Sequence, residues 1–244
     1  MDVILVSLEK VKTSGRVDYD FYDPSQENIT DNMVKGYKKD SLGNVCLKVT
    51  SGKTAPRNAY PEKGVRIIKV KNTTGNGIRW EERFFITPEF YDKAKNKAQV
   101  QVGDMLILCC AHNKSYIGRI DIIDDFPKEV KEDGLRCCSV GELIIIRANP
   151  EKIVPEYLLT FLRLPIVQEQ IRRMVKGQSA HLYSKDLVKL EVVLPPKDVQ
   201  KMLAKMNAKS QKEFLYKIKE AKDSLAATRN KIEGIIINGK LKKR

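Results

Sequence analysis

The chain has 244 residues, with 45 Lys and Arg against 31 Asp and Glu and a formal net charge of +14. Its length suffices for one domain of about 150 to 190 residues with its own core, plus an extension, and its basic balance favours a polyanion, most commonly nucleic acid. No apolar run approaches the roughly 20 residues of a membrane span, and residues 1–7 lack the features of a signal peptide, so a cytoplasmic protein with no membrane partner is expected.

Residues 1–40 are polar and mixed, with breaks at Gly15, Pro24 and Gly36, and they indicate a lead-in segment. From residue 44 onward, short runs rich in Val and Ile alternate with turns that contain Gly, a pattern typical of β-strands. This pattern predicts strands over 45–49, 65–70, 105–110, 117–123, 142–146 and, last, 187–194.

Helices gather late in this part of the chain. Thr87 and Pro88 predict the N-cap and first position of a short helix over 90–96. Two later prolines open helices over 156–162 and 168–174. Strands followed by segregated helices favour an α+β domain over 41–195, with a mixed, twisted β-sheet and short helices.

One long helix is predicted over 196–236, followed by a basic tail over 237–244. No Pro or Gly interrupts residues 197–233, a span of roughly 55 Å. Apolar or small residues recur every three or four positions, which predicts a narrow seam on one helix face: Val199, Leu203, Met206, Ser210, Phe214, Ile218, Ala221, Leu225, Thr228, Ile232 and Ile235. Because so long a seam exceeds what a small domain covers, a second helix is expected to pair with it as a coiled coil.

Positive charge is concentrated in this C-terminal region. Residues 197–244 hold 14 Lys or Arg and 5 Asp or Glu. Besides nucleic-acid binding, a helix face kept in solution by lysine explains this excess, and both interpretations stay open for the helix alone.

Signatures of catalysis are missing from the sequence. The five cysteines lack zinc-ligand spacing and predict packed, reduced thiols. The two histidines, His112 and His181, match no triad or metal pattern. Glu142 stands without a second carboxylate and Lys of a nuclease site, and Gly75-Asn76-Gly77 fits a turn better than a nucleotide-binding loop. A non-enzymatic chain that binds no metal or cofactor is therefore predicted.

Binding features are more plentiful, because four polar turns at strand ends are rich in hydrogen-bond donors. Arg, Lys, Asn and Gln match base edges, whereas Ser, Thr and backbone amides position phosphate. Any one polar turn is an ordinary surface feature, but four on a basic chain favour DNA reading. The candidate DNA-binding residues are Lys53, Thr54, Arg57, Asn58, Asn72, Thr74, Asn76, Arg79, His112, Asn113, Lys114, Ser115, Tyr116, Gln178, Ser179, His181 and Tyr183.

Six short motifs occur in a characteristic order: Val49-Thr50-Ser51-Gly52-Lys53-Thr54, Val102-Gly103-Asp104-Met105-Leu106-Ile107, Ile117-Gly118-Arg119-Ile120, Val154-Pro155-Glu156-Tyr157-Leu158-Leu159, Gly177-Gln178-Ser179-Ala180-His181-Leu182, and Leu194-Pro195-Pro196 with Gln200. In these motifs, over roughly residues 41–233, the chain resembles the specificity (S) subunits of type I restriction–modification enzymes. Residues 15–24 also look like lead-in segments of some relatives. Lys197 and Val199 depart from the family's usual Leu and acidic residue, and Ala180 or His181 replaces its common Gln.

This resemblance implies a target recognition domain that reads a half-site in double-stranded DNA and a spacer helix that packs antiparallel on a second one. It further implies docking of methyltransferase (M) subunits, which bind S-adenosylmethionine, and of restriction (R) subunits using ATP and Mg in a full complex. Family members usually carry two recognition domains and two helices, so this chain resembles a half subunit. A homodimer reading a bipartite palindrome is the simplest completion.

Two other functions remain open at this stage. In the first alternative, the chain is a fragment of a fused methyltransferase–nuclease whose catalytic domains lie elsewhere. In the second, it is an inhibitory or decoy half subunit that captures the methyltransferase through its helix. Methylation assays with and without a partner methyltransferase separate these alternatives from the specificity subunit.

Overall fold

The computed structural model describes residues 4–14, 17, 22, 36–111, 113–177 and 180–238. Contacts divide the chain into two compact units, Met1–Lys201 and Met202–Arg244. Most of the predicted lead-in and most of the basic tail lie outside the described residues, although the lead-in includes helix α1 (Leu8–Ser14). No helix among the described residues combines the length and the apolar character needed to cross a membrane.

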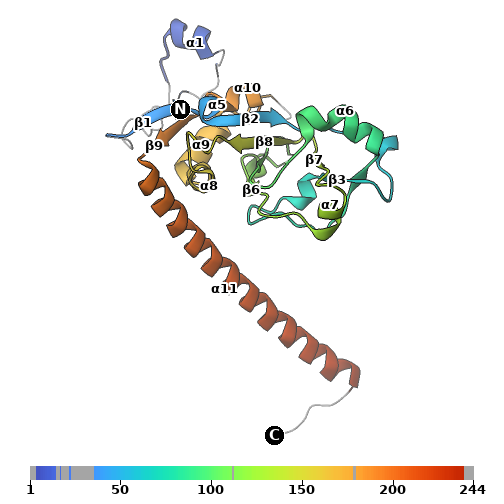
Figure 1. Cartoon of the computed structure of the whole chain (residues 1–244). Coiled ribbons are helices and arrows are strands. Elements are labelled where there is room, and N and C mark those ends of the chain that lie inside the picture. Colours follow the sequence, from blue (N-terminus) through green and yellow to red (C-terminus); the bar gives the residue numbers. More distant parts are fainter. Residues whose placement is uncertain are drawn as a thin grey trace. The chain divides into compact units, whose positions relative to one another are not determined.

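The first unit contains three small sheets in its described part (Figure 1). One has the strand order β2-β8-β5-β6, comprising Cys46–Ser51, Leu143–Ala148, Met105–Leu108 and Ile120–Ile122. A second has the order β4-β3-β7, comprising Phe85–Ile86, Val65–Ile68 and Cys137–Ser139, and a third pairs β1 (Lys38–Ser41) with β9 (Glu191–Leu194). The neighbours β3 and β7 are parallel, whereas the other strand pairs are antiparallel.

Several helices of the first unit begin where the sequence supplies a cap or a proline. The hydroxyl of Thr87 accepts the Phe90 N–H at 3.3 Å at the start of the helix that follows it, and Pro155 and Pro165 occupy the first positions of two others. The helices are α5 (Leu42–Val45), α6 (Pro88–Ala98), α7 (Lys128–Glu132), α8 (Pro155–Leu162), α9 (Pro165–Arg173) and α10 (Ser184–Leu187). The predicted α+β class is confirmed.

Both faces of the four-stranded sheet are buried along its central strands β5 and β8. Leu106 and Leu108 alternate along β5 with Met105 and Ile107, and all four side chains are fully buried. Because successive side chains of a strand point to opposite faces, the first two join the main apolar cluster with residues of α6 and β3, and the other two lie on the opposite face. Burial of each such side chain stabilises the fold by about 1.5–3 kcal/mol, which explains why β5 is a continuous apolar run in the sequence.

The structure corrects three features of the predicted elements. Residues 38–40, predicted as lead-in, belong to β1 and pair with β9. The last predicted strand, 187–194, begins only at Glu191, because Leu187 ends α10 and the turn after that helix includes residues 188 and 189. The sequence pattern also misses α7 and β7; β7 is three residues long and lies where two adjacent cysteines give no strand periodicity.

The long helix is confirmed as α11 (Lys197–Asn238), 42 residues or about 63 Å. Its first turn is held by Gln200, whose side chain is 2% exposed. The Gln200 amide donates to the Pro195 carbonyl at 2.8 Å and accepts the Val154 N–H at 2.9 Å. This contact gives the Leu-Pro-Pro and Gln motif a structural role, since it joins the start of α11 to the start of α8.

Candidate nucleic-acid interface

Two of the four predicted binding loops, the first after β2 and the third between β5 and β6, leave the four-stranded sheet at one shared end. Ser51 at the end of β2 pairs with Ile144 at the start of β8, and Leu108 at the end of β5 pairs with Leu143. Ile120, the first residue of β6, pairs with Ile107. Loops that follow β2 and β5, and those that precede β8 and β6, therefore gather at the same edge.

The loop after β2 is held tightly against the start of β8. The Gly52 N–H donates to the Leu143 carbonyl at 2.9 Å, and a Cβ on Gly52 would lie 2.1 Å from the Ser139 carbonyl oxygen. The Thr54 hydroxyl donates to the Glu142 carboxylate at 3.0 Å. Glu142 therefore holds a loop in place, while Arg57 and Asn58 beyond it are exposed.

The second loop follows β3, and its Asn72 has a structural role. This side chain is 1% exposed; its amide donates to the Arg79 and Glu82 carbonyls at 2.8 and 2.7 Å and accepts the Lys69 N–H at 2.8 Å. The prediction that Asn72 contacts DNA is wrong, because an amide buried and bonded in this way cannot meet a base edge. Its neighbours Asn76 and Arg79 are exposed.

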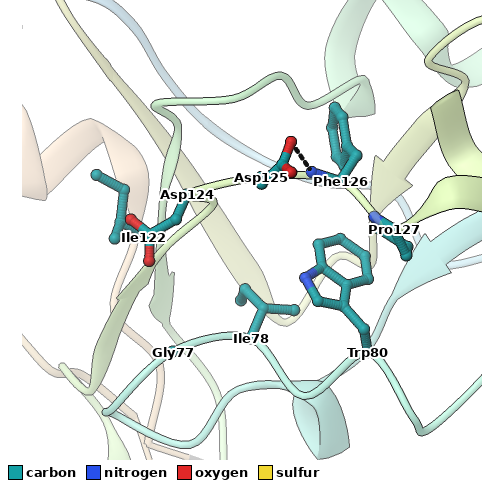
Figure 2. Close-up of a pocket in the computed structure, with 8 residues that line it drawn as sticks. All are labelled: Gly77, Ile78, Trp80, Ile122, Asp124, Asp125, Phe126 and Pro127. Carbon is teal, nitrogen blue, oxygen red and sulfur yellow. Dashed lines mark hydrogen bonds between the residues drawn. The ribbon is translucent and has the colours of Figure 1, made fainter.

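A pocket of about 370 Å³ lies beside this second loop (Figure 2). In its wall the ring of Trp80 meets Phe126 edge-on, with centroids 5.9 Å apart. Burial raises the pKa of Asp124 above its ordinary value, against the opposing effect of Arg163, and Asp125 forms an ion pair with Lys131 at 2.6 Å. Two carboxylates disfavour a phosphate here, so DNA backbone contacts are expected elsewhere. The pocket is lined by Gly77, Ile78, Trp80, Ile122, Asp124, Asp125, Phe126 and Pro127.

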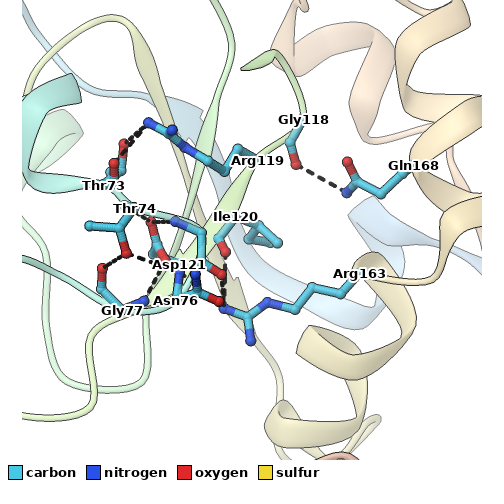
Figure 3. Close-up of polar contacts among 11 residues, drawn as sticks. Thr73, Thr74, Asn76, Gly77, Gly118, Arg119, Ile120, Asp121, Arg163 and Gln168 are labelled. Carbon is cyan, nitrogen blue, oxygen red and sulfur yellow. Dashed lines mark hydrogen bonds and ion pairs between the residues drawn. The ribbon is translucent and has the colours of Figure 1, made fainter. Parts of the chain in front are cut away.

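The turn after Thr73 is held by Asp121 of β6 (Figure 3). One carboxylate oxygen of this fully buried side chain accepts the N–H groups of Thr74 and Gly75 at 2.8 and 2.9 Å, and the other accepts that of Gly77 at 2.7 Å. Three backbone donors converging on one carboxylate fix the turn rigidly. Thr74 contributes as well, because its hydroxyl donates to the Gly77 carbonyl at 2.9 Å.

Two arginines extend this anchor (Figure 3). Arg163, next to the end of α8, donates to the Gly75 and Ile120 carbonyls at 3.2 and 3.1 Å and lies 3.9 Å from the Asp121 carboxylate. Burial lowers the pKa of Arg163, although Asp121 opposes that effect. Arg119 donates to the Thr73 carbonyl at 2.8 Å and lies over the Tyr116 ring, 5.4 Å from its centroid. Arg119 thus connects the second loop to the third.

The third and fourth loops are joined through a backbone bridge between Cys110 and His181. His181 is half-buried and stacks on Tyr183, with ring centroids 5.9 Å apart and planes inclined by 23°. In the third loop the exposed Asn113 side chain accepts the Ser115 N–H and hydroxyl at 3.0 and 2.7 Å, which shapes a short turn. Three predicted site residues lie outside the described part of the chain: His112, Gln178 and Ser179.

Strand pairing therefore places the first and third loops at one end of the sheet, and contacts of Arg119 and Cys110 attach the second and fourth loops to the third. In the described part, half-buried positions are Thr74 and His181 and the exposed ones are Lys53, Thr54, Arg57, Asn58, Asn76, Arg79, Asn113, Lys114, Ser115, Tyr116 and Tyr183. Exposed Arg, Asn and Lys side chains beside hydroxyl groups suit a surface that contacts both base edges and phosphates.

Sequence reasoning missed the charged residues that support these loops. Asp104, the acidic residue of the Gly-Asp motif, is fully buried and binds Arg147 through two hydrogen bonds of 2.7 and 2.8 Å. This pairing raises the pKa of Arg147. The sequence did contain a signal for both residues. Asp104 and Asp121 each stand alone among apolar residues, and a carboxylate buried there needs a charged or hydrogen-bonding partner.

The buried cysteines of the described residues pack inside the fold. Burial raises the pKa of the Cys109 and Cys138 thiols to about 12, as expected for packed thiols that stay protonated. Within the described ranges, no three His, Cys, Asp or Glu side chains are grouped to hold a metal ion.

No protein-family model matches the chain. A curated relative, the type I restriction enzyme MjaVIII specificity subunit of Methanocaldococcus jannaschii, is 23% identical over 223 residues, covering 85% of this chain and 50% of the relative. The crystal structure of the HsdS subunit from Thermoanaerobacter tengcongensis matches with a TM-score of 0.53 and 18% identity, covering 77% of this chain and 40% of that one. A structure from work on complex assembly and conformational transition of the type I R-M system matches with a TM-score of 0.58 and 18% identity, covering 95% and 55%.

These comparisons confirm the resemblance that the sequence motifs indicate. The solved structures show the fold, which comprises the α+β unit and the long helix. The chain spans about half the length of the curated relative.

Proposed function

We propose that this chain is the DNA-recognition subunit of a type I-like restriction–modification system, reading one half-site with the loops at the shared end of the sheet. The single observation that carries the proposal is the set of exposed polar loops, two at one end of the sheet and two attached to them, on a scaffold similar in fold to a solved HsdS subunit. The net charge of +14 supports it, because a basic surface attracts the DNA backbone.

The proposal assigns no chemistry to the chain itself. Asp104, Asp121 and Glu142 are occupied with arginine, backbone or hydroxyl partners. Adenine methylation is therefore attributed to docked methyltransferase subunits, which bring S-adenosylmethionine. Restriction subunits that use ATP and Mg complete the proposed complex.

A second copy supplies the missing half in this proposal. The chain covers half of its curated relative, and the α11 seam includes Met206, Phe214, Leu225 and Ile232, each at least half exposed. We expect light scattering at tens of micromolar to give twice the mass of one chain. A monomer at that concentration contradicts the homodimer.

Methylation of a mixed DNA pool, with and without a candidate methyltransferase, tests the function. Adenine methylation at one bipartite sequence, seen only when both proteins are present, is the expected result. Methylation by this chain alone contradicts the non-catalytic assignment. Inhibition of a complete methyltransferase complex on addition of this chain instead identifies the inhibitory half subunit.

The loops make a specific prediction about site choice. Arg57→Ala and Asn113→Ala are each expected to relax specificity at one base pair and to lower affinity for the cognate site by about 1–3 kcal/mol. Lys219→Ala, at an exposed lysine of α11, is expected to weaken DNA binding evenly on all sequences. It is also expected to reduce the slope of log binding constant against log salt concentration by at most about one. Competition binding with single-base variants of the site measures both effects, and equal losses on every sequence for the loop variants contradict base reading.

A further inference from the structure

The pocket beside the second loop has a composition that the DNA-recognition proposal does not use (Figure 2). Its volume of about 370 Å³ lies within the usual range of ligand sites, about 300–1,000 Å³. The lining residues are mainly apolar, and they include the indole ring of Trp80 and the carboxylates of Asp124 and Asp125. A few polar groups in an apolar pocket are the usual composition of a site that holds one ligand group in a fixed orientation.

The two carboxylates of the pocket differ in what they already bind. Asp125 is satisfied, because one of its oxygens accepts the Phe126 N–H at 2.9 Å and the other pairs with Lys131 at 2.6 Å. Asp124 forms no hydrogen bond or ion pair with another residue that the structure describes, and Arg163 acts on it only at longer range. Burial raises the pKa of Asp124, as expected for a carboxylate that has no close positive partner.

Two cations near Asp124 are engaged elsewhere. Arg163 lies 3.9 Å from the Asp121 carboxylate and donates to two main-chain carbonyls, and Lys131 pairs with Asp125. An incoming cation would therefore provide a close counter-charge that the described residues do not supply. On a chain with a net charge of +14, this acidic pocket is a local exception, and it attracts positive groups where most of the surface repels them.

We infer that this pocket binds the guanidinium group of an arginine side chain presented by a partner protein. A guanidinium is a planar fork that donates two hydrogen bonds to one carboxylate and packs flat on an aromatic ring. Asp124 offers its two oxygens and Trp80 a partly exposed indole, and Figure 2 shows them on different sides of the pocket. The inference goes beyond the proposed function and does not depend on it.

The carboxylate supplies the main attraction in this site. A buried guanidinium, that of Arg66, already lies 5.7 Å from the centre of the Trp80 ring. A second cation gains little further electrostatic energy from the same ring, so Trp80 contributes mainly packing. Loss of the Asp124 charge is therefore expected to weaken binding more than any change in the apolar wall.

The rest of the pocket favours an arginine within a polypeptide over a free amino acid or a nucleotide. None of the other lining side chains carries a positive charge that would hold the α-carboxylate of free arginine or a phosphate. An arginine in a polypeptide has neutral amide groups at that position, and its propyl chain packs on apolar residues. The lining residues apart from the two aspartates are Gly77, Ile78, Trp80, Ile122, Phe126 and Pro127.

Fluorescence of Trp80 reports occupancy of the pocket, because Trp80 is the single tryptophan and lines it. The probe is N-acetyl-arginine amide, titrated into the full chain at constant ionic strength. We expect a saturable change with half-saturation at about 1–10 mM, as suits one charged contact. N-acetyl-citrulline amide has nearly the same shape but no charge, and it is expected to bind at least about tenfold more weakly. Free arginine and N-acetyl-lysine amide are also expected to bind more weakly.

Variants test the role of the carboxylate. Asp124→Asn keeps the size of the side chain and is expected to weaken probe binding at least about tenfold. Asp124→Ser is a second variant without the carboxylate, and the urea-unfolding midpoints of both check that they fold. Asp92→Asn in α6 is the matched control, because its ion pair with Lys95 is exposed and lies outside the pocket. This control is expected to bind the probe within about twofold of the parent.

The outcomes distinguish the possible ligands. The inference is overturned if the blocked arginine gives no saturable change up to about 50 mM, or if folded Asp124 variants bind it as well as the parent does. Equal binding of the citrulline or lysine compound also overturns it, since the site then does not select a guanidinium. Tighter binding of free arginine overturns the protein source and indicates a small-molecule site. Guanosine that binds with dependence on Asp124, when arginine does not, identifies a nucleobase pocket instead.

Discussion

Asp121→Asn is expected to lower the free energy of unfolding by about 3–5 kcal/mol and to abolish site-specific binding. An asparagine presents one oxygen and one NH₂ group where the carboxylate presents two acceptors. Either Gly77, or Thr74 and Gly75 together, then lose the acceptor of their N–H groups. The half-buried Arg163 also loses the counter-charge of Asp121, although that of Asp124 remains. Urea unfolding followed by the fluorescence of Trp80, the single tryptophan, measures the loss.

Asp125→Asn is the matched control for this variant. It lies four residues away and its ion pair with Lys131 is largely exposed, so the unfolding midpoint is expected to change little. An Asp121→Asn protein as stable as the parent would show that the turn does not depend on the carboxylate. Retained DNA specificity in a destabilised variant would show that the turn does not position the reading residues.

Gly52→Ala is expected to destabilise the chain by about 3 kcal/mol and to impair specific binding more than non-specific binding. An added Cβ would lie 2.1 and 2.3 Å from the carbonyl oxygens of Ser139 and Val140. Both atoms belong to the backbone, so the segment between β7 and β8 must move. The first loop, with Arg57, moves with it. Thermal unfolding and competition binding on cognate and scrambled DNA report the two effects.

Gly141→Ala is the comparison for this variant. Gly141 lies on the other side of the contact between the loop after β2 and the segment before β8. Its Cβ would meet the Thr54 hydroxyl at 2.7 Å, a side-chain atom that rotates away. A smaller loss of stability is therefore expected than for Gly52→Ala. Equal losses in the two variants would mean that the close backbone approach at Gly52 is not what excludes a side chain.

Much of the fold was predictable because burial leaves a clear pattern in the sequence. The central strands β5 and β8 are largely continuous apolar runs, and Thr87, Pro155 and Pro165 mark helix starts that the structure confirms. The long helix was predictable from the absence of breaks over residues 197–233. The loops were predictable as polar turns, and strand pairing then explains why the first and third of them share one end of the sheet.

The supporting contacts were not predictable, because their partners are far apart in the sequence. Asp121 bonds to amides 44 to 47 residues away, and Arg163 reaches the Gly75 carbonyl 88 residues away. A pattern of neighbouring residues contains no record of such pairs. Asn72 was misassigned for a related reason: its residue type suits a base edge, but its burial depends on the path of the whole segment up to Glu82. Short elements such as α10 and β7 have too few residues to show a periodicity.

The side chains that hold the loops differ from those that the loops expose. Asp121, Arg163 and Asn72 bond to backbone atoms inside the scaffold, whereas Arg57 and Lys114 project from a main chain that others keep in shape. Point substitutions at such projecting positions change the chemistry offered to a base pair while the fold persists. A chain built in this way is therefore suited to acquire new target sequences in evolution, and laboratory retargeting is best begun at these positions.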